Sequence, residues 1–234
     1  MNTTYDGTID WDRYWGEADD EDAEDASPSA DLIVDPLFEF LDEMGVSGPY
    51  ADVGCGAGAV VFGLAERYPE TSVVGYDSAQ QVLARNRERT RNASLTNVEF
   101  ERCVLPAFDP ERRFEAVSCF YTLVYVAEVE RALRNLYDAV APGGLLVLTY
   151  HNRLARAQFG SVAEAPEERL DQSSPFEPRR YTERFELLIE GENLLSYDRI
   201  HDVLGTRPRS VWSVVSEDLR YPAWRHNPLV YVPK

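Results

Sequence analysis

The chain has 234 residues, enough for one domain with a sizeable buried core. It carries 41 acidic against 23 basic side chains, a net charge of −18, and Lys234 is its only lysine. This charge argues against nucleic acid as a partner, because phosphate contacts need clustered cations. No apolar run is long enough to predict a membrane span, and the first residues do not resemble a signal peptide, so we expect a cytoplasmic protein.

The excess of acids also bears on habitat. A surface of this charge repels itself at low salt, whereas at about 1 M salt the Debye length falls to about 3 Å and most of the repulsion disappears. We therefore expect a halophilic organism whose cytosol is concentrated in salt. The oligomeric state stays open.

The N-terminal segment divides into an aromatic part and an acidic part. Residues 9–15 include two tryptophans and a tyrosine, and residues 17–25 hold seven acids in nine positions. So dense a run of like charge predicts a solvated linker. We assign residues 1–30 to this segment and residues 31–234 to the main domain.

Strands and helices alternate along the first part of the main domain. The apolar period and the turn residues predict helices at 31–44, 59–68, 78–91 and 128–140, and strands at 50–53, 72–76, 98–103, 116–120 and 145–150. The third of these helices opens with Ser78-x-x-Gln81, the pattern of a capping box. Strict alternation predicts a parallel sheet with helices on both faces.

The pattern is weaker after residue 150. Residues 151–181 are polar and contain prolines, which indicates an insertion near the site. We expect a strand at 185–189, a helix at 197–204, and two final strands at 210–215 and 229–232.

The most informative motif is a glycine-rich loop. The apolar strand 50–53 leads into Gly54, Gly56 and Gly58 at alternate positions, followed by a predicted helix. Glycines allow tight turns and close approach of a ligand, and the first turn of the helix offers free N–H groups. This arrangement predicts a cofactor cradle.

Two cofactors compete for this cradle. The spacing Gly54-x-Gly56-x-x-Ala59, with Asp77 about 20 residues further on, also fits the dinucleotide fingerprint. Asp52, two positions before the first glycine, would repel a pyrophosphate and attract an ammonium or a sulfonium. The acid favours S-adenosylmethionine over NAD.

On these residues the chain resembles the class I S-adenosylmethionine-dependent methyltransferases. Asp52–Gly58 corresponds to their first motif, the acid Asp77 to their second, and Pro142-Gly143-Gly144 before an apolar strand to a later feature. The resemblance covers residues 31–150. It implies an α/β fold, a doubly wound, seven-stranded, mostly parallel sheet (Rossmann-like), with S-adenosyl-L-homocysteine as the product.

The resemblance also implies a set of cofactor-binding residues: Asp52, Gly54, Cys55, Gly56, Gly58, Asp77, Ser78, Cys103, Val104 and Phe120. Asp77 would accept both ribose hydroxyls. Many relatives have an acid after the third strand, where this chain has Arg102-Cys103-Val104, so the adenine would contact backbone groups and apolar side chains. In the resembling family the N-terminal segment often folds over the cofactor; here it either does so or docks on the domain surface.

The acceptor side is less defined. His151, directly after the fifth strand, is the best-placed candidate base, and it could equally be a structural loop residue. Tyr14, Tyr121, Tyr150 and Asn152 could bind the substrate. No spacing of cysteine and histidine predicts a metal site.

The sequence therefore predicts methyl transfer from S-adenosylmethionine to a small molecule. A non-catalytic protein that binds the same cofactor is one alternative, and an NAD-dependent oxidoreductase is another. The nature of the methylated atom stays open.

Overall fold

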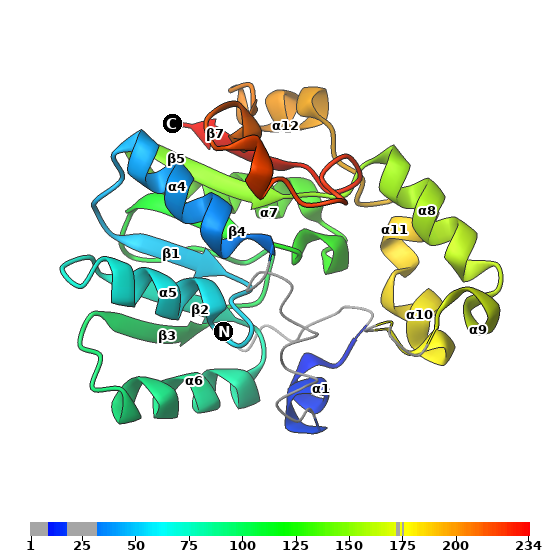
Figure 1. Ribbon diagram of the computed structural model, residues 1–234, viewed down its shortest axis with the longest axis horizontal. Helices are drawn as coiled ribbons and strands as arrows, with labels where there is room; N and C mark the ends of the chain where they lie inside the picture. Colours follow the sequence, from blue (N-terminus) through cyan, green and yellow to red (C-terminus); the bar gives the residue numbers. More distant parts are fainter. Residues whose placement is uncertain (1–8, 18–31, 172–173, 175) are drawn as a thin grey trace.

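The computed structural model describes residues 9–17, 32–171, 174 and 176–234. Apart from Glu17, the predicted acidic linker lies outside the described residues, as does Asp31 at the start of the first predicted helix. Figure 1 shows a sheet flanked by helices, with a separate group of helices to one side.

The sheet has seven strands in the order β3-β2-β1-β4-β5-β7-β6. Their bounds are Tyr50–Val53 (β1), Val73–Asp77 (β2), Val98–Arg102 (β3), Phe114–Cys119 (β4), Val140–Thr149 (β5), Arg209–Ser210 (β6) and Leu229–Pro233 (β7). Strands β1 to β5 pair in parallel, and β7 runs antiparallel to both β5 and β6. The predicted doubly wound, mostly parallel sheet is confirmed.

Helices cover both faces of the sheet, and each face has its own apolar core. Helices α4 (Val34–Met44), α5 (Ala59–Arg67) and α6 (Gln80–Asn92) bury their apolar residues against one face. Helices α7 (Val129–Asp138) and α12 (Tyr197–Leu204) pack on the other. Among the described residues, no helix is both long and apolar enough to cross a membrane.

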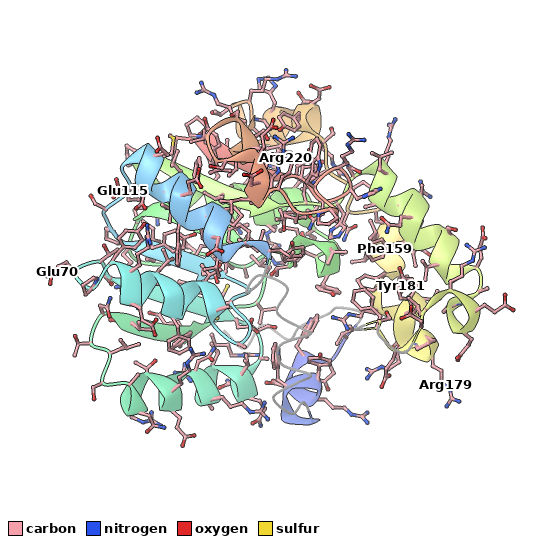
Figure 2. The ribbon with its side chains drawn as sticks, in the orientation of Figure 1. Glu70, Glu115, Phe159, Arg179, Tyr181 and Arg220 are labelled. Carbon is pink, nitrogen blue, oxygen red and sulfur yellow. The ribbon has the colours of Figure 1, made fainter. Side chains whose placement is uncertain are left out.

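The described part of residues 153–190 forms a group of four helices, which we call the cap; it begins within the predicted polar insertion (151–181) and extends beyond it. The four helices are α8 (Arg153–Ala163), α9 (Pro166–Arg169), α10 (Pro178–Arg184) and α11 (Glu186–Glu190). The cap has a small aromatic core of its own, in which the rings of Phe159 and Tyr181 stack with centroids 5.9 Å apart (Figure 2).

Two of the predicted strands are wrong. Residues 185–189 form most of α11, because Phe185, Leu188 and Ile189 are spaced three and four apart and so share one helical face. The strand expected at 210–215 ends at Ser210, after which Val211 and Trp212 are both buried in a 3-10 turn. Two adjacent buried side chains do not fit the alternation of a strand with one exposed face.

Asn97 ties the end of α5 to the beginning of β2. Its Nδ2 group donates to the carbonyl oxygens of Ala65, Tyr68 and Thr71 at 3.2, 3.4 and 3.1 Å. We predict that Asn97→Ala lowers the free energy of unfolding by about 1–3 kcal/mol, because partly buried carbonyls lose their donor. Urea denaturation measures the change, with Asn92→Ala at the exposed end of α6 as the control. Equal stability of the two variants would contradict this role.

Candidate functional site

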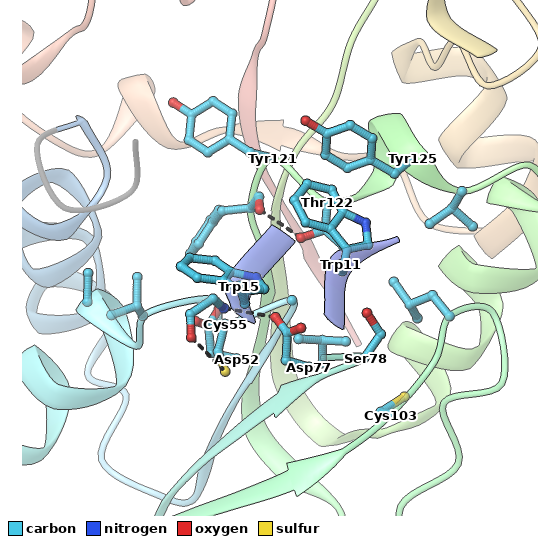
Figure 3. Close-up of a pocket in the computed structure, with 18 residues that line it drawn as sticks. Trp11, Trp15, Asp52, Cys55, Asp77, Ser78, Cys103, Tyr121, Thr122 and Tyr125 are labelled. Carbon is cyan, nitrogen blue, oxygen red and sulfur yellow. Dashed lines mark hydrogen bonds between the residues drawn. The ribbon is translucent and has the colours of Figure 1, made fainter. Parts of the chain in front are cut away.

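A pocket lies at the carboxyl ends of β1, β2 and β4, where the strand order reverses direction (Figure 3). Ligands of doubly wound sheets bind at such switch points. Of the predicted cofactor residues, eight line it: Asp52, Gly54, Cys55, Gly56, Asp77, Ser78, Cys103 and Phe120. The motif spacing therefore found the place of the pocket and eight of its eighteen described lining residues.

The glycine loop is held in a single shape by close packing. The N–H groups of Gly54 and Cys55 both donate to the carbonyl oxygen of Tyr76, at 2.7 and 2.9 Å. Gly54 has φ 81°, and a Cβ there would lie 2.0 Å from Oγ1 of Thr122, so no other residue fits. From α6, buried Asn86 donates to the carbonyl oxygen of Gly56 at 2.8 Å. These contacts stabilise the described conformation of the loop.

Asp77 ends β2 directly beneath this loop. Its carboxylate accepts the N–H of Gly56 at 2.9 Å and that of Ala79 at 3.0 Å. Burial raises the pKa of Asp77, the hydrogen bonds from backbone N–H groups oppose the shift, and the nearby charge of Asp12 adds to it. Because a carboxylate has about four acceptor positions, Asp77 can still accept from a ligand's hydroxyl group.

Asp52 is the second buried acid of the pocket. Its Oδ1 accepts a 2.5 Å hydrogen bond from the hydroxyl of Ser118. The pKa of Asp52 is raised to about 7. Burial is the largest cause, the hydrogen bond from Ser118 opposes it, and the charge of Asp77 adds to the rise. In the described part of the chain, Asp52 and Asp77 are the only charged side chains that line the pocket. The site is therefore suited to a cation.

Helix α1 (Trp11–Glu17) covers the pocket, and the indoles of Trp11 and Trp15 line it (Figure 3). Oδ1 of Asp12 accepts the N–H of Gln80 at 2.5 Å and that of Gln81 at 3.4 Å. The predicted capping box at Ser78 is therefore wrong: α6 begins at Gln80, no side chain caps it from Ala79, and the acid comes from α1.

The far end of the pocket is aromatic. Tyr121 and Tyr125 line it, together with Thr122. Tyr121 has φ 54°, an uncommon conformation for a residue with a Cβ, and its N–H donates to Oγ1 of Thr149 at 2.8 Å. This turn brings the tyrosine from the end of β4 to the edge of the pocket.

Two predicted cofactor residues and three predicted substrate residues do not line the pocket. Gly58 is the N-cap of α5, and Val104 is buried in the neighbouring loop. Tyr14 packs edge-on against Trp11 and Trp15, and Tyr150 is buried in the core below α7. Asn152 caps α8: its Oδ1 accepts two N–H groups, and its Nδ2 donates to the carbonyl oxygen of Arg225.

His151, the predicted base, also lies outside the lining. Its ring packs edge-on against Phe159 of the cap, with centroids 5.7 Å apart. Burial lowers the pKa of His151 to about 4, so the ring is neutral at neutral pH. A catalytic role for His151 stays a prediction.

Sequence reasoning missed Trp11, Trp15 and Tyr125 as residues of the pocket. The available signal was the spacing of Trp11, Tyr14 and Trp15, three and four apart, which places all three on one face of a helix. Tyr125 belongs to a 3-10 turn (Leu123–Tyr125) with no pattern that predicts it.

Comparison with known proteins agrees with this geometry. Residues 51–146 match the family model described as a methyltransferase domain. A demethylmenaquinone methyltransferase from Thermus thermophilus is 34% identical over 113 residues, which is 47% of this chain and 50% of that protein. A trans-aconitate 2-methyltransferase from Sinorhizobium fredii is 29% identical over 123 residues, or 53% and 46% of the two chains. The chain thus spans about half the length of these curated relatives.

Among solved structures, PKMT2 from Rickettsia typhi in complex with AdoHcy superposes with a TM-score of 0.51 at 16% identity, covering 69% of this chain and 32% of that one. The likeness confirms the fold, which is the Rossmann-like fold of methyltransferases.

The buried acid Asp52 makes stability depend on pH. Its pKa rises from 3.8 in the unfolded chain to about 7 in the fold, so between these values the native state holds a proton that the unfolded state releases. Stability should therefore fall as pH rises through this window. We predict that Asp52→Asn reduces this fall by roughly 1–4 kcal/mol between about pH 4.5 and 7.5.

Urea denaturation at both pH values measures the effect. Glu70→Gln removes a charge from an exposed turn (Figure 2) and serves as the control. The same pH dependence in Asp52→Asn and in wild type would show that Asp52 does not titrate in this window.

Proposed function

We propose that the protein is a methyltransferase that transfers a methyl group from S-adenosyl-L-methionine to a small molecule. The observation that carries the proposal is the pair of buried acids, Asp52 and Asp77, on either side of the glycine loop with no basic side chain in the described lining. A cofactor with an ammonium and a sulfonium gains from these charges. The pyrophosphate of NAD would be repelled by Asp52, beside the first glycine of the loop.

The residues present fit this cofactor. We assign the ribose to Asp77, and contact with the loop to Gly54, Cys55, Gly56 and Gly58. Ser78, Cys103, Val104 and Phe120 complete the predicted set, with Asp52 beside the charged end. The cofactor supplies an electrophilic methyl group; the chain binds it, orients it and excludes water from it.

The aromatic end of the pocket supports an acceptor without net negative charge. Tyr121 and Tyr125 line that end, and the two charged side chains of the described lining are both acids. An anion such as the aconitate in the name of some relatives would meet repulsion from Asp52 and Asp77. We propose a neutral or cationic acceptor with a flat, apolar body, bound by Tyr121, with Tyr14, Tyr150 and Asn152 as the remaining predicted substrate residues.

We further propose that α1 is a lid, which extends the predicted layout of an N-terminal segment (1–30) and a main domain (31–234). Isolated helices much shorter than about 12–15 residues are unstable in water, and α1 has 7 residues. Its helical form thus depends on contacts with the domain beneath. Undocking of α1 would open the pocket above Cys55 and Asp77.

Binding and transfer are tested in sequence. We predict that calorimetry detects binding of S-adenosylmethionine and S-adenosylhomocysteine, and not of NAD. Asp77→Asn should weaken binding by roughly 2–3 kcal/mol, the size of a lost charged hydrogen-bond pair. Glu101→Gln, at the exposed end of β3, is the control. Binding of NAD alone would overturn the proposal.

Transfer is then measured with methyl-labelled cofactor and a fractionated extract of small molecules. Label should appear in neutral or cationic compounds and depend on the enzyme. Label confined to anionic compounds would contradict the proposed acceptor class. Binding with no enzyme-dependent label would support the non-catalytic alternative.

We also propose that the protein works in concentrated salt. With a net charge of −18, its midpoint of thermal unfolding should rise as KCl increases from about 0.1 to 2 M, because screening removes self-repulsion. The midpoint is measured by calorimetry in KCl and in sucrose of equal osmolality. A rise in KCl that sucrose does not reproduce is due to screening and not to a general solute effect. An unchanged midpoint in KCl would count against a halophilic origin.

A further inference from the structure

Arg184, the last residue of α10, lies inside a group of aromatic rings that come from three separate parts of the chain. The rings belong to α1, to the 3-10 turn after β4 and to the cap, and their centroids lie 5.2–5.8 Å from the guanidinium carbon: Trp11, Tyr14, Tyr125, Phe176 and Phe185. We call them the arginine box. A guanidinium at this distance from ring faces is held by cation–π attraction.

Arg184 is hydrogen-bonded to one ring of the box, and the rings contact one another. Nε of Arg184 donates to the hydroxyl of Tyr125 at 3.1 Å. The rings of Trp11 and Tyr125 meet edge-on with centroids 4.8 Å apart, and those of Tyr125 and Phe185 stack at 6.1 Å. The planar guanidinium can stack on rings and donate a hydrogen bond at the same time, which an ammonium cannot do.

Two members of the box, Trp11 and Tyr125, also line the cofactor pocket, whereas Arg184 does not. The chain that follows the cap is bonded to the same turn, since Nδ2 of buried Asn193 donates to the carbonyl oxygens of Leu123 and Val124. Arg184 therefore connects the cap to two aromatic residues that line the pocket.

We propose that Arg184 is a positioning residue that fastens α1 to the cap and so controls how long the cofactor stays bound. Helix α1 is held by the burial of Trp15 in the main core, by Asp12 at the first turn of α6, and by Trp11 and Tyr14 at Arg184. Because α1 is too short to be helical alone, loss of the Arg184 contact should let the helix undock more often. This role rests on the proposed cofactor site, but the contact itself can be tested without a ligand.

The ligand-free test is hydrogen exchange of the amides of α1. In Arg184→Gln, the hydrogens of these amides should exchange with solvent about tenfold faster than in wild type. Arg179→Gln is the matched control, because Arg179 lies on the same helix, its side chain is 91% exposed, and it points away from the box (Figure 2). Equal exchange in both variants would overturn the proposal.

The second test is the rate at which bound S-adenosylhomocysteine dissociates. Arg184→Gln should raise it about tenfold, a change that corresponds to about 1.4 kcal/mol. Arg184→Lys, which keeps the charge, and Tyr125→Phe, which removes only the acceptor of the Nε hydrogen bond, should give smaller increases. These two milder variants keep the test decisive if the glutamine variant does not fold.

A double-mutant cycle separates positioning from general destabilisation. If Arg184 acts through Trp11, then Arg184→Gln added to Trp11→Leu should change the dissociation rate less than twofold. Additive effects would show that Arg184 acts elsewhere and would refute the fastening role. Absence of any binding in wild type would refute the proposed cofactor site and leave the exchange result standing.

Discussion

The structure of the pocket depends on two carboxylates that are buried side by side with few groups to offset their charge. Asp52 and Asp77 are 4% and 9% exposed, and burial raises the pKa of both. Buried acids are costly, and here they are held by the hydroxyl of Ser118 and by N–H groups of Gly56 and Ala79. A ligand with positive charge relieves this cost, which is a physical reason for a cationic cofactor.

The order of the strands explains why these groups meet. Residues that end β1 and β2 share one edge of the sheet because the strands run parallel and in register, with Asp52 paired to Gly75 and Val53 to Tyr76. The carbonyl oxygen of Tyr76 then reaches two N–H groups of the glycine loop. The loop's shape is therefore a product of strand pairing as well as of its glycines.

The sequence predicted those parts of the site that depend on local pattern. Asp52, Gly54 and Asp77 could be placed because a glycine loop between a strand and a helix permits few geometries. Trp15 and Tyr125 could not, because their place in the pocket comes from long-range packing of α1 and of the turn after β4.

The predictions for the start of α6 and for the cap failed for the same reason, because both depend on long-range packing. The first turn of α6 looked self-capped by Ser78, but Asp12 reaches it from 68 positions away along the chain. The cap looked polar because its buried side is small and its aromatic residues are widely spaced between charged ones, so only the fold reveals their common core. Local pattern predicts an element; it does not show which distant group completes it.

The acid that caps α6 also links the lid to the charge of the pocket. Asp12 of α1 lies close enough for its charge to raise the pKa of Asp77, so closure of the proposed lid would bring a third acid near a site that already holds two. That repulsion opposes closure when the pocket holds no cation. A cationic cofactor offsets it and makes docking of α1 more favourable, although it need not touch Asp12. If α1 is the proposed lid, its docking would respond to the charge of the ligand, while the arginine box would supply the fixed part of the attachment.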